Sequence, residues 1–424
     1  MTKPKVGDMI EVKTKDKTIK GILMPRPELL DKDSIIIKLQ SGYNIGIENK
    51  NIKEIKTLEK YDEKKEEKKK KVTFNKNLPI ISILHTGGTI ASKIDYRTGG
   101  VESKFSPEDL VELFPELKDI AQIRSKLLFQ MSSENMEPEH WQILAKEVDK
   151  EIKEGTNGII ITHGTDTMHY TAAALSFMLQ SLPIPILLVG AQRSSDRGSS
   201  DAAMNLIAAA NFITKSDFSG VAICMHGTTQ DKCCYIHQGN KARKLHTSRR
   251  DAFRSINVLP IAKVFTNGRI ELSQTPYTKK DKKNKLKLQS KFEDKVAIIK
   301  MRPGFNLKEL ETYENYKGLV IEGTGLGHIP NRMVEEIKKL SKKSLIVMTS
   351  QCIYGTINMN IYSTGRDLID AGVISAENMT SETAYVKLGW ALANSKSKEE
   401  AKKLFQTNIT GEITERIVKE AFLF

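Results

Sequence analysis

Two short runs combine small residues with side chains that could carry out covalent chemistry. The first is Thr-Gly-Gly-Thr-Ile-Ala at residues 86–91, and the second is His-Gly-Thr-Asp-Thr at residues 163–167. Each run follows an apolar stretch that is typical of a β-strand, so each places a threonine where a strand gives way to a turn. In open α/β folds, ligands and catalytic groups gather at the carboxyl edge of a parallel sheet. We therefore expect the hydroxyl groups of Thr89 and Thr165 to converge at such an edge.

Each run also has a simpler structural interpretation. A threonine hydroxyl is a poor nucleophile unless a neighbouring group removes its proton. Gly87 and Gly88 allow a sharp turn and the close approach of a ligand. The backbone amides of this turn could then bind a carboxylate or an oxyanion of that ligand. Taken alone, however, the first run favours an ordinary turn with Thr89 as a helix cap. The second run adds the carboxylate of Asp166, although Thr-Asp-Thr is also a common start of a helix, with Thr167 as its cap.

A base is needed to activate such a hydroxyl, and the polar loop at residues 239–246 contains two lysines. Three arginines lie near Lys244 in the sequence, namely Arg243, Arg249 and Arg250. Crowding by these cations would disfavour the protonated amine and lower the pKa of Lys244. The residues by themselves do not choose between Lys244 and Lys241. The alternative is a basic loop that binds an anionic partner.

Composition restricts the class of protein. A chain of 424 residues can form two domains of ordinary size and a small extra module, and a hydrophobic fraction of 39% suits a globular protein. Its apolar runs are too short to span a bilayer and the N-terminus lacks an apolar signal core, so we expect a cytoplasmic protein without membrane contact. The four cysteines (Cys224, Cys233, Cys234 and Cys352) are too irregular for a disulfide framework or a metal site. The net charge of +14 could attract nucleic acid, although much of it lies in two lysine-rich stretches that resemble solvated linkers.

The alternation of strands and turns divides the chain into five parts. Residues 1–59 predict a small β-barrel of SH3 or Sm type, and residues 60–77 a charged linker or exposed helix. Residues 78–277 alternate strands with helices, which predicts a parallel sheet with helices on both faces. A lysine-rich linker at 278–295 then leads to a smaller α/β domain at 296–424, whose last predicted element is an amphipathic helix at 398–405. In the larger domain we expect strands at 80–84, 158–162 and 186–189 and a helix at 168–182.

Together these residues resemble the asparaginase/glutaminase family, whose signature runs are Thr-Gly-Gly-Thr-Ile and His-Gly-Thr-Asp-Thr. The resemblance extends from residue 79 to the C-terminus. It includes Ser-Ser-Glu-Asn-Met at 132–136, between the two runs, and Gly-Ala-Gln-Arg at 190–193, after them. Residues 239–257 resemble the stretch that bears the catalytic lysine in cytoplasmic bacterial members, and this match selects Lys244. The resemblance implies a two-domain α/β body.

The family's catalytic roles carry over as follows. The resemblance implies that Thr89 attacks the carbon of a side-chain amide, forms an acyl-enzyme and releases ammonia. Thr165, Asp166 and Lys244 would form the second catalytic group, in which the lysine activates a hydroxyl or water. Family members differ over which threonine attacks first, and the sequence leaves that choice open. The resemblance implies no metal or cofactor in this chain.

The same resemblance implies a set of substrate-binding residues. Ser133 and Glu134 would bind the two ends of the substrate's α-amino acid group, next to Gly88. A glutamate at position 134 points to glutamine as the substrate. For the family's mobile lid tyrosine, Tyr96 is the only nearby candidate. The glycine-rich residues 323–328 resemble a segment that reaches the site of a neighbouring subunit in homologues, although a glycine-rich turn is the alternative.

The predicted barrel and linker are absent from simple asparaginases, and the whole arrangement resembles the ammonia-producing subunits of archaeal-type tRNA-dependent amidotransferases. This implies that ammonia made from glutamine passes to a partner, the E subunit of the amidotransferase, which binds tRNA(Gln) and uses ATP and Mg to amidate a glutamyl ester. It also implies a homodimer of this chain within a heterotetramer. This chain has no Gly-x-x-x-x-Gly-Lys loop, in agreement with an ATP site elsewhere. Two alternatives remain, a free-standing asparaginase/glutaminase and a non-catalytic RNA-binding protein.

Overall fold

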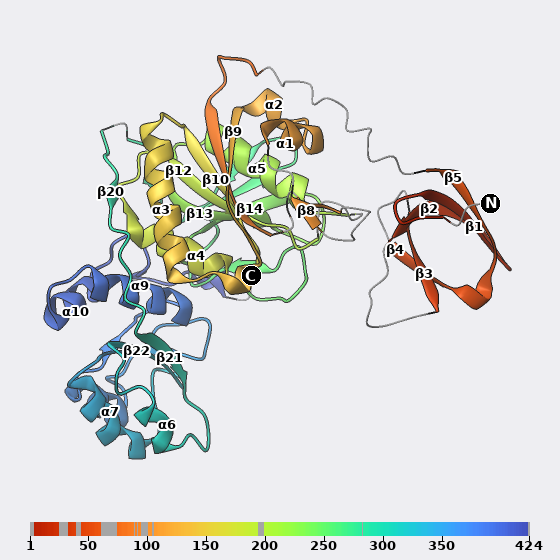
Figure 1. Ribbon diagram of the computed structural model, residues 1–424. Helices are drawn as coiled ribbons and strands as arrows, with labels where there is room; N and C mark the ends of the chain where they lie inside the picture. The colour runs from red at the N-terminus through yellow and green to blue at the C-terminus, as the bar shows by residue number, and fades with distance from the viewer. Residues whose placement is uncertain are drawn as a thin grey trace.

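The computed structural model describes residues 4–24, 33–39, 44–60, 74–88, 90, 92–94, 101–103, 106–193, 199–281 and 283–422. Figure 1 shows a curled N-terminal sheet, a large α/β unit and a smaller α/β unit. No helix in these ranges is both long enough and apolar enough to cross a membrane.

The N-terminal module is an antiparallel sheet with the strand order β4-β3-β2-β1-β5. Its strands are β1 (Met9–Thr14), β2 (Thr18–Met24), β3 (Ser34–Lys38), β4 (Asn44–Glu48) and β5 (Ile52–Glu59), with the short helix η1 (Asn49–Asn51) before β5. Alternate side chains form its core, because Ile10 and Val12 of β1 are buried together with Ile19 and Ile37. The sequence pattern predicts strands at 9–12, 18–23, 34–39 and 43–47, which correspond to β1 to β4, but it does not predict the lysine- and glutamate-rich β5.

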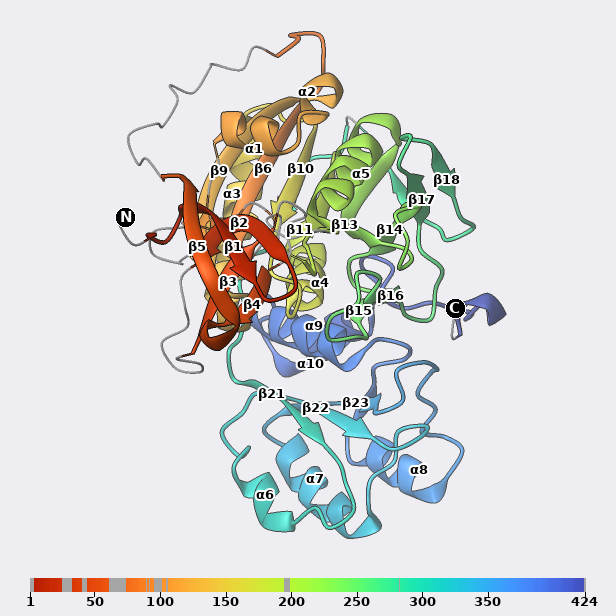
Figure 2. The ribbon, with the colours of Figure 1, turned by 90° about the vertical axis from the view of Figure 1, so that its right-hand side faces the viewer.

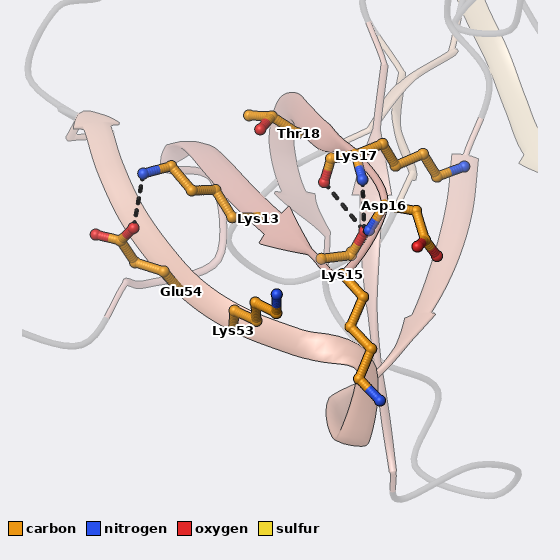
Figure 3. A pocket seen from close by; sticks show the side chains of 8 residues that line it. Lys13, Lys15, Asp16, Lys17, Thr18, Lys53 and Glu54 are labelled. Atoms are coloured by element: carbon orange, nitrogen blue, oxygen red, sulfur yellow. Dashed lines mark hydrogen bonds and ion pairs between the residues drawn. The ribbon is translucent and has the colours of Figure 1, made fainter.

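Figure 1 shows this sheet curving strongly, but no hydrogen-bonded pairing joins β4 to β5 among the described strands. The closed barrel of SH3 or Sm type is therefore not confirmed. A hollow beside the β1–β2 turn is lined by Lys15, Lys17 and Lys53, and the Lys13 ammonium pairs there with Glu54 at 2.8 Å (Figure 3). Its residues belong to neither threonine run, so this hollow is not the candidate catalytic site.

The large unit is built on one long sheet with the order β18-β17-β14-β13-β12-β10-β6-β9. Its parallel strands are β9 (Gln122–Met131), β6 (Ile80–Gly87), β10 (Gly158–Thr162), β12 (Pro185–Val189) and β13 (Phe218–His226). Its antiparallel strands are β14 (Cys233–Gln238), β17 (Ala262–Phe265) and β18 (Ile270–Leu272). The predicted parallel sheet is thus right for the half that carries the threonine runs and wrong for the half beyond β13. Two strands outside it, β7 (Ser92–Ile94) and β8 (Val101–Ser103), pair with each other.

Helices cover both faces of this sheet, as the alternating pattern predicts. Ile159 and Ile161 of β10 belong to the core that includes α3 (Pro138–Lys153) and α4 (Met168–Met178). Ile160 points to the opposite core, which includes α1 (Pro107–Leu113), α2 (Leu117–Ile120) and α5 (Ala202–Lys215). Helix α4 is shorter than the predicted helix at 168–182, because the chain turns at its end into β11 (Leu179–Gln180).

The second lysine-rich stretch is attached to the large unit instead of forming a free linker. Strand β19 (Thr278–Lys279) pairs with β13, and β20 (Lys287–Leu288) pairs with β11. The Lys280 ammonium also donates to the carbonyls of Ile213 and Ser216, at 2.8 and 2.9 Å. Of the first predicted linker, residues 61–73 lie outside the described residues.

The smaller unit contains the parallel sheet β21-β22-β23-β24, with β21 (Val296–Lys300), β22 (Gly318–Gly323), β23 (Leu345–Ser350) and β24 (Ile374–Ser375). Its helices are α6 (Leu307–Glu311), η3 (Asn331–Met333), α7 (Val334–Ser341), α8 (Ser363–Asp370), α9 (Ser381–Ala393) and α10 (Lys398–Gln406). Figure 2 shows α9 between the two units, and its Trp390 stacks on Phe177 of α4.

The chain continues beyond the predicted last helix. After α10, Thr410 accepts hydrogen bonds from the side chains of Gln238 and Asn240 in the large unit, and a short helix η4 (Lys419–Ala421) follows. The C-terminal segment therefore joins the two units.

Candidate active site

Four adjacent parallel strands end at one edge of the large sheet, and a candidate motif follows each of them. Strands β9, β6, β10 and β12 lead into residues 132–135, 88–90, 163–166 and 190–193. The Oγ1 atom of Thr86 donates to the carbonyl of Thr162 at 2.9 Å, which ties the end of β6 to the end of β10. The structure thus brings the described residues 86–88 of the first run and Gly164 of the second run together at a carboxyl edge. The predicted convergence of the Thr89 and Thr165 hydroxyls stays a prediction.

The two glycines of the first run are required by backbone crowding. Gly87 and Gly88 have positive φ angles of 114° and 79°, which L-residues rarely adopt. A Cβ atom on Gly87 would lie 2.1 Å from the carbonyl oxygen of Met131, and one on Gly88 would lie 2.9 Å from the amide nitrogen of Gly164. Among the described atoms, the backbone of Met131 therefore crowds Gly87, and the backbone of Gly164 crowds Gly88.

The segment after β9 packs against the second run at Gly164. A Cβ atom on Gly164 would lie 2.8 Å from Cβ and 2.9 Å from Oγ of Ser133, so only glycine leaves room for that serine. The Oγ1 atom of Thr167 donates to the carbonyl of Ser133 at 2.6 Å. Thr167 holds the N-cap position of α4, but its hydroxyl bonds the neighbouring segment instead of the helix, so the capping interpretation is wrong for its side chain.

Lys244 completes the group from a separate element. It ends β15 (Ala242–Lys244), which pairs with β16 (Phe253–Ser255) in a hairpin. Its Nζ atom donates to Oγ1 of Thr165 at 2.8 Å and to Oδ1 of Asp166 at 2.7 Å. The lysine side chain is 9% exposed and that of Asp166 is 68% exposed, so the pair lies at the edge of the solvent. An amine, a hydroxyl and a carboxylate thus meet within hydrogen-bonding distance.

The arginines near Lys244 are compensated by carboxylates, which the predicted crowding did not include. Arg243 pairs with Glu382 of α9 at 2.8 Å, and Arg250 pairs with Asp231 at 2.5 Å. Arg249 and Arg254 both bind the carboxylate of Asp251; these hydrogen bonds, that from Arg249 first, hold its pKa well below the usual value. Each of the three arginines that the sequence places near Lys244 is therefore paired with a carboxylate.

Lys241 lies in a different environment from Lys244. Its side chain is fully buried, and its Nζ donates to Oδ1 of Asn378, in the smaller unit, at 2.5 Å. Burial lowers the pKa of Lys241 to about 7. Of the two lysines, Lys244 is the one that bonds described residues of the second threonine run, whereas Lys241 bonds Asn378.

His163 is a supporting residue that the sequence analysis did not single out. It follows β10, with Nδ1 2.7 Å from the carbonyl of Gly164 and Nε2 2.9 Å from Oγ1 of Thr171. Burial lowers the pKa of His163 to about 4, so the ring is neutral near pH 7 and Nδ1–H donates to Gly164. The spacing of residues in the sequence does not predict this role, because the fold alone brings the hydrogen-bond partner Thr171 of α4 to His163.

The structure describes only some of the remaining predicted site residues. Thr89 and Tyr96 lie outside the described residues. Ser133 and Glu134 lie in the short helix η2 (Ser133–Asn135); the serine is buried and the glutamate is exposed. In the described part of the chain, no three histidine, cysteine, aspartate or glutamate side chains are grouped so that they could hold a metal ion.

Family models match three stretches of the chain. Residues 80–278 match the asparaginase N-terminal domain and residues 295–405 the glutaminase/asparaginase C-terminal domain. Residues 4–58 match the GatD N-terminal domain.

Full-length relatives and solved structures agree with these matches. The D subunit of glutamyl-tRNA(Gln) amidotransferase from Pyrococcus furiosus is 50% identical, with 99% of this chain and 97% of that protein covered. The corresponding D subunit from Methanobrevibacter smithii is 46% identical, with coverage of 99% and 96%. The thermostable L-asparaginase of Thermococcus kodakarensis superposes with a TM-score of 0.72 at 33% identity, over 79% of this chain and 99% of that one. L-asparaginase I of Vibrio cholerae gives 0.70 at 29% identity, over 80% and 99%.

Proposed function

The chain belongs to the family of glutamyl-tRNA(Gln) amidotransferase D subunits, and we propose that it is the glutaminase of such an enzyme. It hydrolyses the side-chain amide of glutamine and supplies ammonia for the conversion of Glu-tRNA(Gln) to Gln-tRNA(Gln). One observation carries the chemistry: the Nζ atom of Lys244 lies 2.8 Å from Oγ1 of Thr165 and 2.7 Å from Oδ1 of Asp166, beside the glycine turn of the first run.

In the proposed reaction, Thr89 attacks the amide carbon and its hydroxyl proton passes to the leaving nitrogen. The carbon–nitrogen bond breaks, ammonia leaves, and the glutamyl group is held as an ester on Thr89. Lys244, in its uncharged form, then accepts a proton from water, either directly or through the Thr165 hydroxyl, and the water oxygen attacks the ester carbon. The bond from that carbon to the Thr89 oxygen breaks, glutamate leaves, and the proton held by Lys244 returns to Thr89. Asp166 holds the lysine in place, as its 2.7 Å hydrogen bond supports.

The proposed substrate contacts come from the segments that pack against Thr165. Ser133 lies next to Gly164, and Glu134 follows it with an exposed side chain that can reach the substrate's α-amino group. We assign Gly88 to the same binding site because a Cβ atom added to it would lie 2.9 Å from the amide nitrogen of Gly164. Tyr96 is the proposed lid residue.

We further propose the assembly that the family resemblance implies. Ammonia passes to the E subunit of the amidotransferase, which binds tRNA(Gln) and requires ATP and Mg, whereas this chain needs no cofactor of its own. The complex works in the cytoplasm. Two copies of this chain form a homodimer within a heterotetramer.

Exposed apolar side chains support the homodimer. They are Leu326, Ile353, Ile361 and Tyr362, 37–59% exposed, on the loops that follow β22 and β23. The amide of Asn358 donates to the carbonyl of Leu326 at 3.0 Å, and the Tyr362 ring contacts the ring of His328, so the two loops lie together. Exposed apolar groups on adjoining loops are typical of protein interfaces.

We retain the domain limits at 1–59, 60–77, 78–277, 278–295 and 296–424, which the family-model matches at 4–58, 80–278 and 295–405 support. The strong curvature of the N-terminal sheet supports a small SH3- or Sm-like barrel. Such a module adds a surface for the partner subunit or for RNA without altering the amide-cleaving site.

The decisive experiment measures ammonia release from glutamine by the purified chain, alone and with the E subunit, ATP, Mg and Glu-tRNA(Gln). We expect the full set of components to stimulate the release strongly. A diazoketone analogue of glutamine, followed by mass spectrometry, should label Thr89; labelling of Thr165 instead would reverse the two roles. Lys232→Met, which changes an exposed lysine of the same unit, is the control for Lys244→Met.

A free-standing asparaginase is the second candidate, because the large and small units superpose on L-asparaginases with TM-scores near 0.7. Rapid hydrolysis of free asparagine by the chain alone, indifferent to the E subunit and to tRNA, would favour it over our proposal.

A further inference from the structure

The hairpin that carries Lys244 needs support from outside itself. Strands β15 and β16 have three residues each, and an isolated two-stranded ribbon is only marginally stable in water. The connection at residues 245–252 adds little regular structure, since neither strand extends into it. A displacement of about 1 Å in a catalytic group can cost on the order of 100-fold in rate. Contacts with other elements must therefore fix the position of the lysine. Two of them start on the strands themselves, from Arg243 to Glu382 of α9 at 2.8 Å and from Ser255 to His237 of β14 at 2.8 Å. The connection supplies a further one.

Arg250, within that connection, makes such a contact. Its Nη1 atom lies 2.5 Å from Oδ1 of Asp231, and its Nη2 atom donates to the carbonyl of Thr229. Both partners lie on the loop between β13 and β14, so the arginine bridges the hairpin to the main sheet. The arginine side chain is 16% exposed and that of Asp231 is 66% exposed, so the pair is charge-assisted but open to solvent on the side of the carboxylate.

The carboxylate of Asp231 also forms a hydrogen bond with a buried histidine. His226, at the end of β13, is fully buried, with Nε2 3.1 Å from Oδ1 of Asp231 and Nδ1 2.7 Å from Oδ1 of Asn205. Both of these oxygens are acceptors, so both bonds form together only when each ring nitrogen carries a proton. The bond from His226, followed by the attraction of Arg250, holds the pKa of Asp231 below its usual value.

Asn205 connects this chain of contacts to Thr165. Its Nδ2 atom donates to the carbonyl of Gly190 at 2.9 Å and to Oδ2 of Asp201 at 3.1 Å, which fixes the amide's orientation. The turn that begins at Gly190 packs on Thr165, because a Cβ atom on Gly190 would lie 2.8 Å from Cγ2 of the threonine. The contacts thus run from the wall behind Thr165 to the hairpin of Lys244.

We propose that Asn205, His226, Asp231 and Arg250 form a positioning relay that holds the Lys244 amine against the Thr165 hydroxyl. None of the four bonds either of these two catalytic groups directly, so each acts through the backbone that it anchors. The proposal rests on the proposed glutaminase function only in its kinetic test, where kcat refers to the hydrolysis of glutamine. The relay itself concerns only the contacts that fix the position of the hairpin of β15 and β16.

The test is a double-mutant cycle with Asp231→Ala and Arg250→Ala in the full complex, with Glu271→Gln of the exposed Arg269 pair as the control. We expect each single variant to lower kcat for glutamine roughly 10- to 100-fold, with KM changed less than about threefold, because substrate binds on other segments. The double variant should be no slower than the slower single variant, since one connection is broken in all three. Arg250→Lys should recover part of the rate. Losses that multiply, or that fall wholly in KM, would overturn the relay.

Hydrogen exchange separates this inference from the proposed function. Amides of residues 242–255 should exchange faster in Asp231→Ala than in the unmodified chain, whether or not the protein hydrolyses glutamine. Unchanged exchange together with an unchanged kcat would contradict the relay. Faster exchange in a chain that hydrolyses no glutamine would retain the relay as a structural device and refute the function.

Discussion

Lys244 is the residue on which the proposed chemistry depends most directly, because its amine bonds a hydroxyl and a carboxylate at once. General acid–base groups typically contribute about 10²- to 10⁴-fold to a rate. We expect Lys244→Met to lower kcat by about that factor while the melting temperature shifts little, since the side chain is only a local contact. Steady-state kinetics and thermal unfolding measure the two quantities. Equal losses in Lys232→Met, or none in Lys244→Met, would remove the assignment.

The two lysines of the loop also show what sequence reasoning can and cannot reach at this scale. The residue types predict a base somewhere in residues 239–246, but nothing local separates Lys241 from Lys244. The partner that distinguishes them, Asn378, lies 137 residues away from Lys241. The same limit applies to Arg243, because its partner Glu382 lies on α9, far along the chain. Such partners are set by tertiary packing and leave no trace in local spacing.

At the scale of elements, the turn after β10 is built around the absence of a side chain at Gly164. An added Cβ atom would meet Ser133 at 2.8 Å, and the contact is with the base of that side chain, which cannot move aside alone. We expect Gly164→Ala to destabilise the fold by about 1–3 kcal/mol, typical of overpacking, and to reduce activity strongly. Adding Ser133→Gly should restore the melting temperature but not the activity. If stability were not recovered, the crowding would have another source.

Strand β6 carries a second structural histidine, whose burial gives a pH dependence. His85 bonds Oγ1 of Thr162 at 2.8 Å and Oγ of Ser125 at 3.0 Å, and burial lowers its pKa to about 3. Between its unfolded pKa of about 6.5 and that value, the unfolded chain binds the extra proton, so stability falls as the pH falls. We expect the melting temperature to drop between pH 7 and pH 5, and to drop less in His85→Gln. Parallel curves for the two proteins would contradict this account.

The sequence predicts these elements best where the pattern is purely local. Gly158–Thr162 contains three consecutive isoleucines and is bounded by turn residues, and the structure has β10 over those same residues. The antiparallel strands β14, β17 and β18 are missed because they follow no helix and carry mixed patterns. Strand β5 is missed for two reasons. Lysines and glutamates fill its exposed positions, and its few inward-facing residues are only partly buried.

At the scale of the whole molecule, the two α/β units are joined by a buried polar cluster near the hairpin of β15 and β16. Lys387 of α9 and Glu412 of the C-terminal segment form an ion pair in which both side chains are fully buried. Glu412 also accepts from the backbone amides of Ile409 and Thr410, and Lys387 donates to the carbonyl of Thr407 at 2.7 Å. The carboxylate thereby fixes the segment whose Thr410 binds Asn240, four residues before Lys244.

Breaking one partner of a buried pair leaves an uncompensated charge, which costs about 3–5 kcal/mol, whereas removing both charges together costs much less. Burial already lowers the pKa of Lys387, so its ammonium depends on this one carboxylate. We expect Lys387→Met and Glu412→Gln each to lower the free energy of unfolding by about that amount. The double variant should lose clearly less than the sum, as measured by urea unfolding of the full chain. Strict additivity would mean that the two groups stabilise the junction independently and that the ion pair does not hold the C-terminal segment against Asn240.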